Sequence, residues 1–577
     1  MVESWDVVVV GSGPGGLTVG ACLAAVGNRV LVLERHDLAG GNCQVFRRHH
    51  HGAEFEFDVG LHYIGDCGPG GLFPSILNSL GIGDRVEFRP LDPDGFDTLH
   101  FPDLEIRVPA GWDAYRDRLV EALPDDQAAI ERCLDVLQRV ADESRSRMLP
   151  GAETPTFDEW AFRPLSDLFE SCELSDRAEA VIDHWSGLYA GGPARTAVAM
   201  HAGIIDHYMR GAFYPEGGGQ VIPARLAQVI EANGGEIRTL CPVEEIVVTD
   251  RSARGVRLAD GTVINAPLVI SNADYARTVT ELVDRTQWDP ATVAWVEHAT
   301  MTLGLVCVYV IVDVDLTDGP NTNYFVFPGY ETDRLYDELD AGTLVEGDMF
   351  AYIAIASRKD PANGRLCPAG HTNFQIMTLA PRGYDYWGLD DGPAHGGTYR
   401  RNAGYRRRKA DITDRLLAAA ETVFGPIRDH IVHIETATPI TQERYTHSTG
   451  GTSYGYEHSP EQTGDQRPQH RTEIDGLWVV GANTASGHGI AGTMVGGVNA
   501  AGQILERALL VEMILGTQLM DPAAIPPDPE GFDPVEWCRG ALLRETRSMG
   551  RAARVDAQRH SPSLDPKVAG SGSGSCD

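Results

Sequence analysis

The sequence lacks the features that mark secreted and membrane-spanning proteins. No apolar run approaches the roughly 20 residues that a spanning helix needs. No basic segment and no small-residue cleavage site precede the strand-like valine run after Asp6, so no secretory signal is expected. The ten cysteines include no C-x-x-C pair and no zinc-like spacing, which favours reduced thiols over disulfides or a metal centre. These absences predict a cytoplasmic protein without a metal.

Positive charge is also scarce. The 48 Lys and Arg residues stand against 82 Asp and Glu residues, so the formal net charge is -34 at pH 7. Such a surface repels polyphosphates except at local basic patches. Nucleic acid is therefore not an expected partner. The length of 577 residues exceeds the roughly 250 to 300 residues at which a single core stops growing, so two domains are expected.

A strand, a glycine-rich turn and a helix open the chain. The apolar run from Asp6 to Val10 is typical of a parallel-sheet strand covered by helices on both faces. It leads into Gly11-Ser-Gly-Pro-Gly-Gly16, a helix from Leu17 to Val26, and a second strand from Val30 to Leu33 that ends at Glu34. This order predicts a dinucleotide-binding unit.

Each glycine of the turn has a separate task. Gly11 permits the tight turn, Gly13 lets the backbone approach a pyrophosphate, and Gly16 lets the helix pack on the strand. Glu34 lies about twenty residues further on and is expected to accept the ribose hydroxyls. No second strand-anchored fingerprint occurs, so the chain lacks the nicotinamide domain of a two-nucleotide reductase.

The remaining pattern alternates between two domains. Charged helices are expected from Gly111 to Tyr214, β-rich segments of an antiparallel sheet from Thr302 to Thr378, and a buried strand from Gly476 to Gly481. We assign 1–110, 215–285 and 425–510 to a discontinuous cofactor domain, 111–214 and 286–424 to a substrate domain, and 511–577 to a C-terminal extension. The terminal Gly-Ser run is typical of a flexible tail.

Several motifs carry a family resemblance. The segment Arg35-His-Asp-Leu-Ala-Gly-Gly41 resembles the acid-plus-GG extension of amine oxidases, phytoene desaturases and Rab GDP-dissociation inhibitors. Phe57 to Gly65 looks like the F-D-x-G-x-H-Y segment of carotenoid isomerases and retinol saturases, and Phe213 to Gly219 like their Y-P-x-G-G turn. Thr438 to Tyr445 is similar to their T-P-L-T-x-x-R segment, and Gly481 to Gly497 to their C-terminal flavin motif.

The resemblance, which spans Val7 to Leu510, is to the FAD-dependent phytoene desaturase, carotenoid isomerase and retinol saturase-like oxidoreductases. It implies an α/β protein with a two-domain FAD-binding Rossmann-like fold of the amine oxidase type. It also implies an α+β substrate domain containing an antiparallel sheet, and a flavin beneath a long apolar channel. The implied FAD-binding residues are Gly11, Gly13, Pro14, Gly16, Glu34, Arg35, Gly40, Gly41, Val243, Gly481, Gly492, Thr493 and Met494.

Two histidines are candidate catalytic residues. His62 follows the turn that family members place near the flavin. Two roles are open for its imidazole: shuttling a proton during double-bond chemistry, or forming structural hydrogen bonds. His488 lies in Ser486-Gly-His-Gly-Ile-Ala-Gly492, where the family usually has proline on either side of the flavin-facing turn. It is a candidate for orienting substrate or donating to the flavin. A helix beginning near Thr493 is expected to aim its amides at the flavin pyrimidine.

Other basic or histidine-rich segments favour plain structural roles. His49 to His51 point alternately to opposite faces of a strand and are expected at a hairpin tip, not around a metal. The charges of Tyr405-Arg-Arg-Arg-Lys409 are expected to spread around a solvated helix. A basic amphipathic helix is expected over Trp537 to Val555, and the residues from Asp533 to Glu536 resemble its capped start. This helix either docks on the acidic protein or lies on an anionic membrane.

The resemblance predicts an FAD-dependent saturase, desaturase or isomerase of a polyene, isoprenoid, carotenoid or other unsaturated lipid. Two alternatives stay open: a flavin amine oxidase, and a non-catalytic lipid-binding escort of the GDP-dissociation-inhibitor type. The expected partners are a hydrophobic small molecule, a membrane surface to which the protein binds peripherally, and an electron donor or acceptor that the sequence does not name.

Overall fold

The computed structural model describes residues 3–50, 52–147, 151–390, 392, 396–540 and 544. Most of the basic helix expected from Trp537 to Val555 and the Gly-Ser tail lie outside these ranges. A short helix, α18 (Pro534–Trp537), does begin at the expected position, where the side chain of Asp533 accepts a 3.0 Å hydrogen bond from the Val535 amide. Every helix in the described ranges is too short or too polar to cross a membrane.

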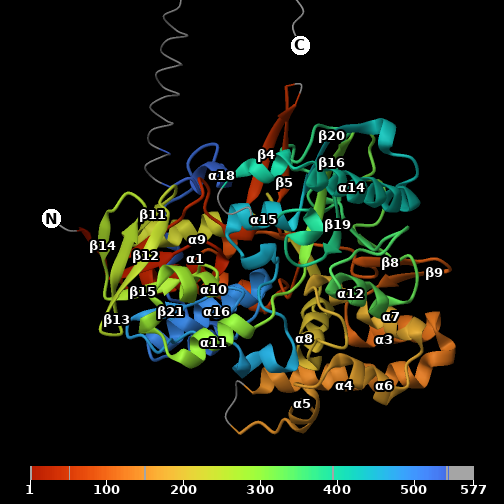
Figure 1. The fold of residues 1–577 in the computed structure, drawn as a ribbon, viewed down its shortest axis with the longest axis horizontal. Coiled ribbons are helices and arrows are strands. Elements are labelled where there is room, and N and C mark those ends of the chain that lie inside the picture. Colours follow the sequence, from red (N-terminus) through yellow and green to blue (C-terminus); the bar gives the residue numbers. More distant parts are fainter. Residues whose placement is uncertain are drawn as a thin grey trace, which may run out of the picture.

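A five-stranded sheet in which every neighbouring pair is parallel forms the first layer. Its order is β11 (Glu236–Arg238), β3 (Val30–Leu33), β2 (Val7–Val10), β15 (Leu268–Ser271) and β21 (Leu477–Val479). Three helices pack together beside it: α1 (Pro14–Ala25), α9 (Val221–Ala232) and α16 (Gly489–Ile504). Figure 1 shows this layer on the left, with the sheet in red, yellow-green and blue.

Alternate valines of β2 face opposite sides of the sheet. Val7 and Val9 join the core that contains helix α1, whereas Val8 and Val10 join a core with residues of a four-stranded sheet. That sheet has the order β1 (Glu3–Ser4), β14 (Val263–Asn265), β13 (Ser252–Leu258) and β12 (Val243–Thr249). The valine run predicts helices on both faces. On one face the structure has a β-sheet instead, which buries the valines equally well.

A seven-stranded sheet forms the second large layer. Its order is β20 (Ile431–Ala437), β16 (Gly304–Val312), β19 (Thr372–Ala380), β18 (Ala351–Ala354), β17 (Asn323–Val326), β8 (Asp97–Phe101) and β9 (Leu104–Val108). All neighbours are antiparallel except β17 and β8. The predicted antiparallel sheet is confirmed. β8, β9 and β20 pair within this sheet although 1–110 and 425–510 are assigned to the cofactor domain.

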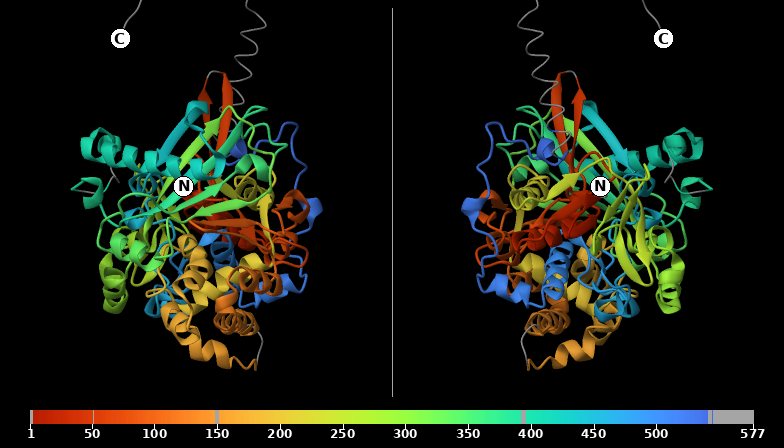
Figure 2. Two further views of the ribbon diagram at one scale, coloured as in Figure 1. Left: turned by 90° about the vertical axis from the view of Figure 1, so that its right-hand side faces the viewer. Right: turned by 90° about the vertical axis from the view of Figure 1, so that its left-hand side faces the viewer.

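A group of helices lies at one end of the seven-stranded sheet, below β8 and β9 in Figure 1 and at the bottom of both views in Figure 2. Six of them are α3 (Trp112–Ala122), α4 (Gln127–Ser146), α5 (Pro155–Trp160), α6 (Leu165–Cys172), α7 (Asp176–Ile182) and α8 (Val198–Met209). The helices predicted between Gly111 and Tyr214 are therefore confirmed. A long helix, α14 (Ala403–Phe424), contacts β18 and β19.

Shorter elements complete the fold. The remaining strands are β4 (Val45–His50), β5 (Ala53–Asp58), β6 (Ile64–Gly65), β7 (Phe88–Pro90) and β10 (Ala212–Pro215). The remaining α-helices are α2 (Leu72–Ser79), α10 (Tyr275–Arg277), α11 (Pro290–His298), α12 (Thr332–Asp340), α13 (Ala356–Lys359), α15 (Pro439–Thr446) and α17 (Leu509–Ile514). β4 and β5 pair as the hairpin predicted around His49, and it projects from the molecule in Figure 1.

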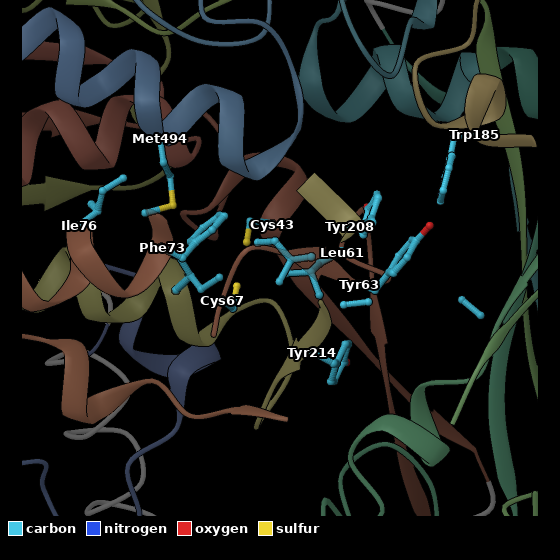
Figure 3. Packing of buried hydrophobic residues seen from close by; sticks show 14 of the residues in the cluster. Cys43, Leu61, Tyr63, Cys67, Phe73, Ile76, Trp185, Tyr208, Tyr214 and Met494 are labelled. Atoms are coloured by element: carbon cyan, nitrogen blue, oxygen red, sulfur yellow. The ribbon is translucent and has the colours of Figure 1, made fainter. Parts of the chain in front are cut away.

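The largest core continues from the parallel sheet into the helices. Figure 3 shows Met494 of α16 close to Phe73 and Ile76 of α2, and Tyr63 beside Tyr208. The rings of Tyr63 and Tyr208 stack with centroids 4.3 Å apart. A shared core holds the two layers together, so groups at their boundary are fixed by both.

Candidate functional site

A glycine-rich turn joins β2 to α1 at one end of a large cavity. Gly11 adopts a left-handed φ of +94°, and α1 begins at Pro14 after the N-cap residue Gly13. Gly11, Gly13 and Pro14 all line the cavity. Proline suits the first helical position because that amide has no partner within the helix. A Cβ at Gly16 would collide with the carbonyl oxygen of Gly11, so Gly16 shapes the turn from behind.

Glu34 holds this turn to the end of the next strand. Its carboxylate is 8% exposed and accepts hydrogen bonds from the amide and hydroxyl of Ser12 at 3.0 and 2.6 Å and from the His36 amide at 2.8 Å. The Ser12 hydroxyl also accepts a 3.2 Å hydrogen bond from the amide of Gly40. Gly41 lies so close that an added Cβ would be 2.9 Å from the Cα of Gly13. The acid, the glycine turn and the GG doublet therefore form one interlocked unit.

The other expected cofactor-binding residues divide into two groups. Arg35, Val243, Gly481 and Thr493 line the cavity, whereas Gly40, Gly492 and Met494 do not. The helix expected to begin near Thr493 begins earlier, at Gly489, so Gly489 and Ile490 provide its first residues at the cavity. The glycine-rich turn before α16 allows this early start. Met494 points into the core instead.

The cavity is polar at the glycine turn and has one apolar wall, and charged side chains such as Arg277, Glu281 and Glu435 line other parts of it. Its volume is about 1540 Å³, larger than the roughly 300–1,000 Å³ of ordinary small-molecule pockets. The apolar wall comes from β4, β16, β19 and the loop before Gly455; it contains Phe46, Leu305, Cys307, Tyr309, Met377 and Tyr454. A dinucleotide therefore fits at the glycine end and leaves room for an apolar molecule.

His62 lines the cavity just after β5. Its ring packs edge-on against Tyr352 at 5.9 Å, and its carbonyl oxygen accepts a 2.5 Å hydrogen bond from Lys359 Nζ. Burial first, and the positive charge of Lys359 second, lower the pKa of His62 to about 3. The imidazole is therefore neutral at physiological pH. It can donate or accept a hydrogen bond there, but it carries no positive charge.

His488 lies behind the apolar wall and does not line the cavity. Its Nε2 lies 3.1 Å from the Leu188 carbonyl oxygen, and its Nδ1 lies 2.8 Å from His458 Nε2. Arg467 Nη1 lies 3.3 Å from His458 Nδ1. Because arginine can only donate and a carbonyl can only accept, each histidine must donate from Nε2. Burial, then Arg467, lower the pKa of His488 to about 4, so this neutral chain persists at neutral pH.

The ring of Tyr454, which does line the cavity, packs against His488 with centroids 4.8 Å apart. His488 therefore supports the wall through Tyr454 and does not itself line the cavity. Both of its ring nitrogens lie within hydrogen-bond distance of protein groups. Its candidate role of orienting substrate or donating to the flavin stays a prediction.

Sequence reasoning missed Lys359 and Asn272. Lys359 is 2% exposed and lies 5.9 Å from the ring centroids of both Tyr63 and Tyr214. Burial lowers the pKa of Lys359 to about 7, although the negative charges of Asp97 and Asp58 oppose this shift. Nothing in the local sequence marks it as buried. Asn272 follows β15 and lines the cavity beside Gly11, a position that the rule of ligand binding at carboxyl strand ends could have identified.

No three His, Cys, Asp or Glu side chains lie together in a way that could hold a metal ion, within the ranges described. The described cysteines are free thiols, in line with the sequence.

The fold has a parallel sheet with a glycine turn, an acid at the end of the next strand, and a cavity that a second sheet closes. These features define a two-layered, dinucleotide-dependent enzyme. The family model described as flavin containing amine oxidoreductase matches residues 14–315, more than half of the chain. The chain therefore belongs to that family, and its cofactor is FAD, as the sequence predicts. The predicted two-domain FAD-binding fold class is likewise confirmed.

Known proteins that are similar to this chain support the same family assignment. All-trans-retinol 13,14-reductase of Danio rerio is 29% identical over 550 residues, which cover 88% of this chain and 87% of that protein. Prolycopene isomerase 2, chloroplastic, of an Oncidium hybrid cultivar is 26% identical over 530 residues, covering 87% and 84%. The crystal structure of an oxidoreductase from Methanosarcina mazei has a TM-score of 0.57 at 18% identity, covering 87% of this chain and 100% of that chain.

The contact between Gly41 and Gly13 yields a testable prediction. Gly41→Ala places a Cβ 2.9 Å from backbone and adds strain at a φ of +55°, so FAD binding should weaken by about 1–3 kcal/mol. Gly27→Ala is the matched control, because Gly27 also has a positive φ but nothing within 4 Å of its added Cβ. The ratio of flavin to protein after dialysis measures the effect. Equal flavin loss in both variants would show that backbone strain alone matters.

Proposed function

We propose that this enzyme acts on the C=C or CH-CH bonds of a hydrophobic polyene, isoprenoid, carotenoid or other unsaturated lipid, as a saturase, desaturase or isomerase. The observation that supports this proposal most is that the cavity that contains the glycine turn also has an apolar wall of Phe46, Leu305, Cys307, Tyr309, Met377 and Tyr454. The similar proteins named above support it, since their names state reduction of all-trans-retinol and isomerisation of prolycopene.

The chain's own residues bind and orient the substrate, and they keep water out of the site. The apolar wall holds a carbon chain and excludes water, which suits chemistry at unactivated carbon. FAD, when bound, supplies hydride exchange at its N5 atom. His62 offers a neutral hydrogen-bonding group at the wall, and the chain of Arg467, His458 and His488 fixes Tyr454 behind it.

We infer how the cofactor is held. Gly11, Gly13 and Pro14 would hold the pyrophosphate at the start of α1, and Glu34 would hold the ribose. Gly41, Arg35, Val243, Gly481 and Thr493 would complete the cofactor's walls, while Gly16, Gly40, Gly492 and Met494 support them from behind. We retain the division into FAD-binding, substrate and C-terminal parts as a proposal. In it β8, β9 and β20 extend the substrate sheet.

We also propose peripheral binding to a membrane, because a long polyene dissolves in lipid and not in water. The basic segment after Asp533 is the proposed contact. Liposome flotation that is unaffected by truncation after Asp533 would reject this contact. The single dinucleotide fingerprint implies that electrons come from or go to an external carrier, unless the net reaction is an isomerisation.

The substrate class can be read from the flavin spectrum. Oxidised and pre-reduced enzyme are mixed anaerobically with polyenes, unsaturated fatty acids and amines in a stopped-flow spectrometer. We expect polyenes to change the flavin absorbance and polyamines to leave it unchanged, because placing a charged ammonium group against the apolar wall costs its hydration without supplying a partner. If only amines change the spectrum, the C=C assignment is wrong and amine oxidation takes its place.

A further inference from the structure

A second cavity adjoins the mouth of the FAD cavity. Its volume is about 760 Å³, which lies in the roughly 300–1,000 Å³ range of small-molecule sites. One face of α14 lines it, together with residues of β20, α15 and β4, which Figure 1 shows in the upper part of the molecule. Arg48, Glu435, Thr441 and Tyr445 line both cavities. A ligand in the second cavity would therefore lie one side chain away from the first.

Both acids that line the second cavity are already paired with arginines. Glu435 accepts hydrogen bonds of 2.7 and 2.9 Å from the Nε and Nη2 atoms of Arg48. Asp414 pairs with Arg428, whose guanidinium also bonds to Glu421 at 3.0 Å. The negative charge of the cavity wall is therefore neutralised by these pairs.

Three cations of the same wall have no such partner. Arg400, Arg406 and Lys409 line the cavity, and in the part of the chain that the structure describes no acid lies within salt-bridge distance of them. Burial lowers the pKa of Lys409, and the charge of Glu435 partly restores it. These three cations give the cavity wall an excess of positive charge, although the whole chain has a net charge of -34.

This cavity accounts for part of the basic run after Tyr405. Arg406 and Lys409 are three residues apart on α14 and therefore share one helical face, which lines the cavity. Arg408 lies over the ring of Tyr386 at 5.3 Å, and Arg407 is exposed. The charges do spread around the helix, as the sequence predicts, but two of them converge with Arg400.

The charge and geometry favour a phosphate-type anion. A carboxylate carries one negative charge, whereas a phosphate or diphosphate offers several oxygens and a charge that matches three cations. Guanidinium groups bind phosphate oxygens through paired N–H donors, and a lysine adds a point charge. The exposed ring of Tyr445 adds an apolar surface at the junction with the FAD cavity.

We propose that the second cavity binds the phosphate group of an organic ligand whose remainder reaches the mouth of the FAD cavity. Two ligands share this chemistry. One is a phosphorylated isoprenoid, which would make the site a substrate head-group pocket. The other is a reduced pyridine dinucleotide phosphate, which would make it the docking site of an electron donor. The proposal does not depend on which bond the enzyme acts on.

Calorimetric titration of the FAD-loaded, full-length protein with inorganic pyrophosphate tests the site. Wild-type protein should bind, and Arg406→Met or Lys409→Met should weaken binding roughly ten- to a hundredfold, because a charge-assisted bond is lost. Arg407→Met is the matched control, since it removes the same charge from the same helix outside the cavity. Arg406 is exposed, so its replacement leaves the fold intact. No binding by the wild type, or equal weakening by Arg407→Met, would overturn the proposal.

Competition experiments then identify the source of the phosphate. Displacement of pyrophosphate by geranylgeranyl diphosphate, but not by geranylgeraniol, would assign the substrate role; displacement by NADPH would assign the donor role. If neither displaces pyrophosphate, the cavity binds free anions only and the proposal of an organic ligand is overturned. The flavin response of the wild type to polyenes and amines is measured separately. Failure of the proposed function is thus distinguishable from failure of this site.

Discussion

Arg467→Met is expected to destabilise the protein by about 3–5 kcal/mol and to release much of the FAD. Arg467 is 2% exposed, and burial lowers its pKa to about 10. Its guanidinium donates to five carbonyl oxygens at 2.8–3.1 Å, those of Tyr456, Glu457, Gln462, Ala482 and Thr484. Methionine fills a similar length but cannot donate, so these buried carbonyls lose their donor.

Loss of Arg467 should also affect the cofactor, because Ala482 and Thr484 lie in the segment that leads to α16. Denaturant unfolding followed by flavin fluorescence measures stability, and the flavin-to-protein ratio measures retention. Arg471→Met is the control, since Arg471 is exposed and lies four residues away. An unchanged unfolding midpoint with full FAD content would show that this network does not hold the segment.

Glu34→Ala should weaken FAD binding by about 1.5–3 kcal/mol, roughly ten- to a hundredfold, because charge-assisted bonds to the ribose are lost. The carboxylate lines the cavity while also accepting bonds from the Ser12 and His36 amides. Part of the loss therefore comes from a loosened turn. The dissociation constant of FAD for reconstituted apoprotein is the quantity to measure.

Ser12→Ala separates the two contributions of Glu34. It removes the 2.6 Å hydroxyl bond to Glu34 and the acceptor of the Gly40 amide, but it leaves the carboxylate in place. A smaller loss of affinity than in Glu34→Ala is expected. If Glu34→Ala binds FAD as tightly as the wild type, the carboxylate does not contact the ribose.

The cofactor end of the cavity could be predicted from sequence because its causes are local. Gly11, Gly13, Gly16 and Glu34 lie within about 30 residues of one another in a unit whose spacing is set by one strand, one helix and the next strand. The start of α16 at Gly489 could not be placed in the same way. Glycines there permit several starting points, and only the packed structure selects one.

The wall of the site depends on contacts between distant segments. Lys359 reaches His62 across almost three hundred residues, and His488 meets Leu188 across three hundred. The pairing of β8 with β17 likewise joins segments far apart in sequence. Sequence periodicity does not reveal such contacts, which is why the position of His488 behind the wall and the existence of the second cavity emerged only from the structure.

The most direct test of the central claim, that this enzyme acts on carbon-carbon bonds of a polyene, is the analysis of the product. FAD-loaded enzyme, pre-reduced in one sample and oxidised in another, is incubated anaerobically with an all-trans polyene, and the product is separated and examined by absorbance and mass. We predict a product with the same carbon skeleton and an altered double bond: shortened conjugation after saturation, extended conjugation after desaturation, or changed geometry at unchanged mass after isomerisation. Polyenes recovered unchanged from both samples, with amines oxidised by the same preparation, would contradict the account.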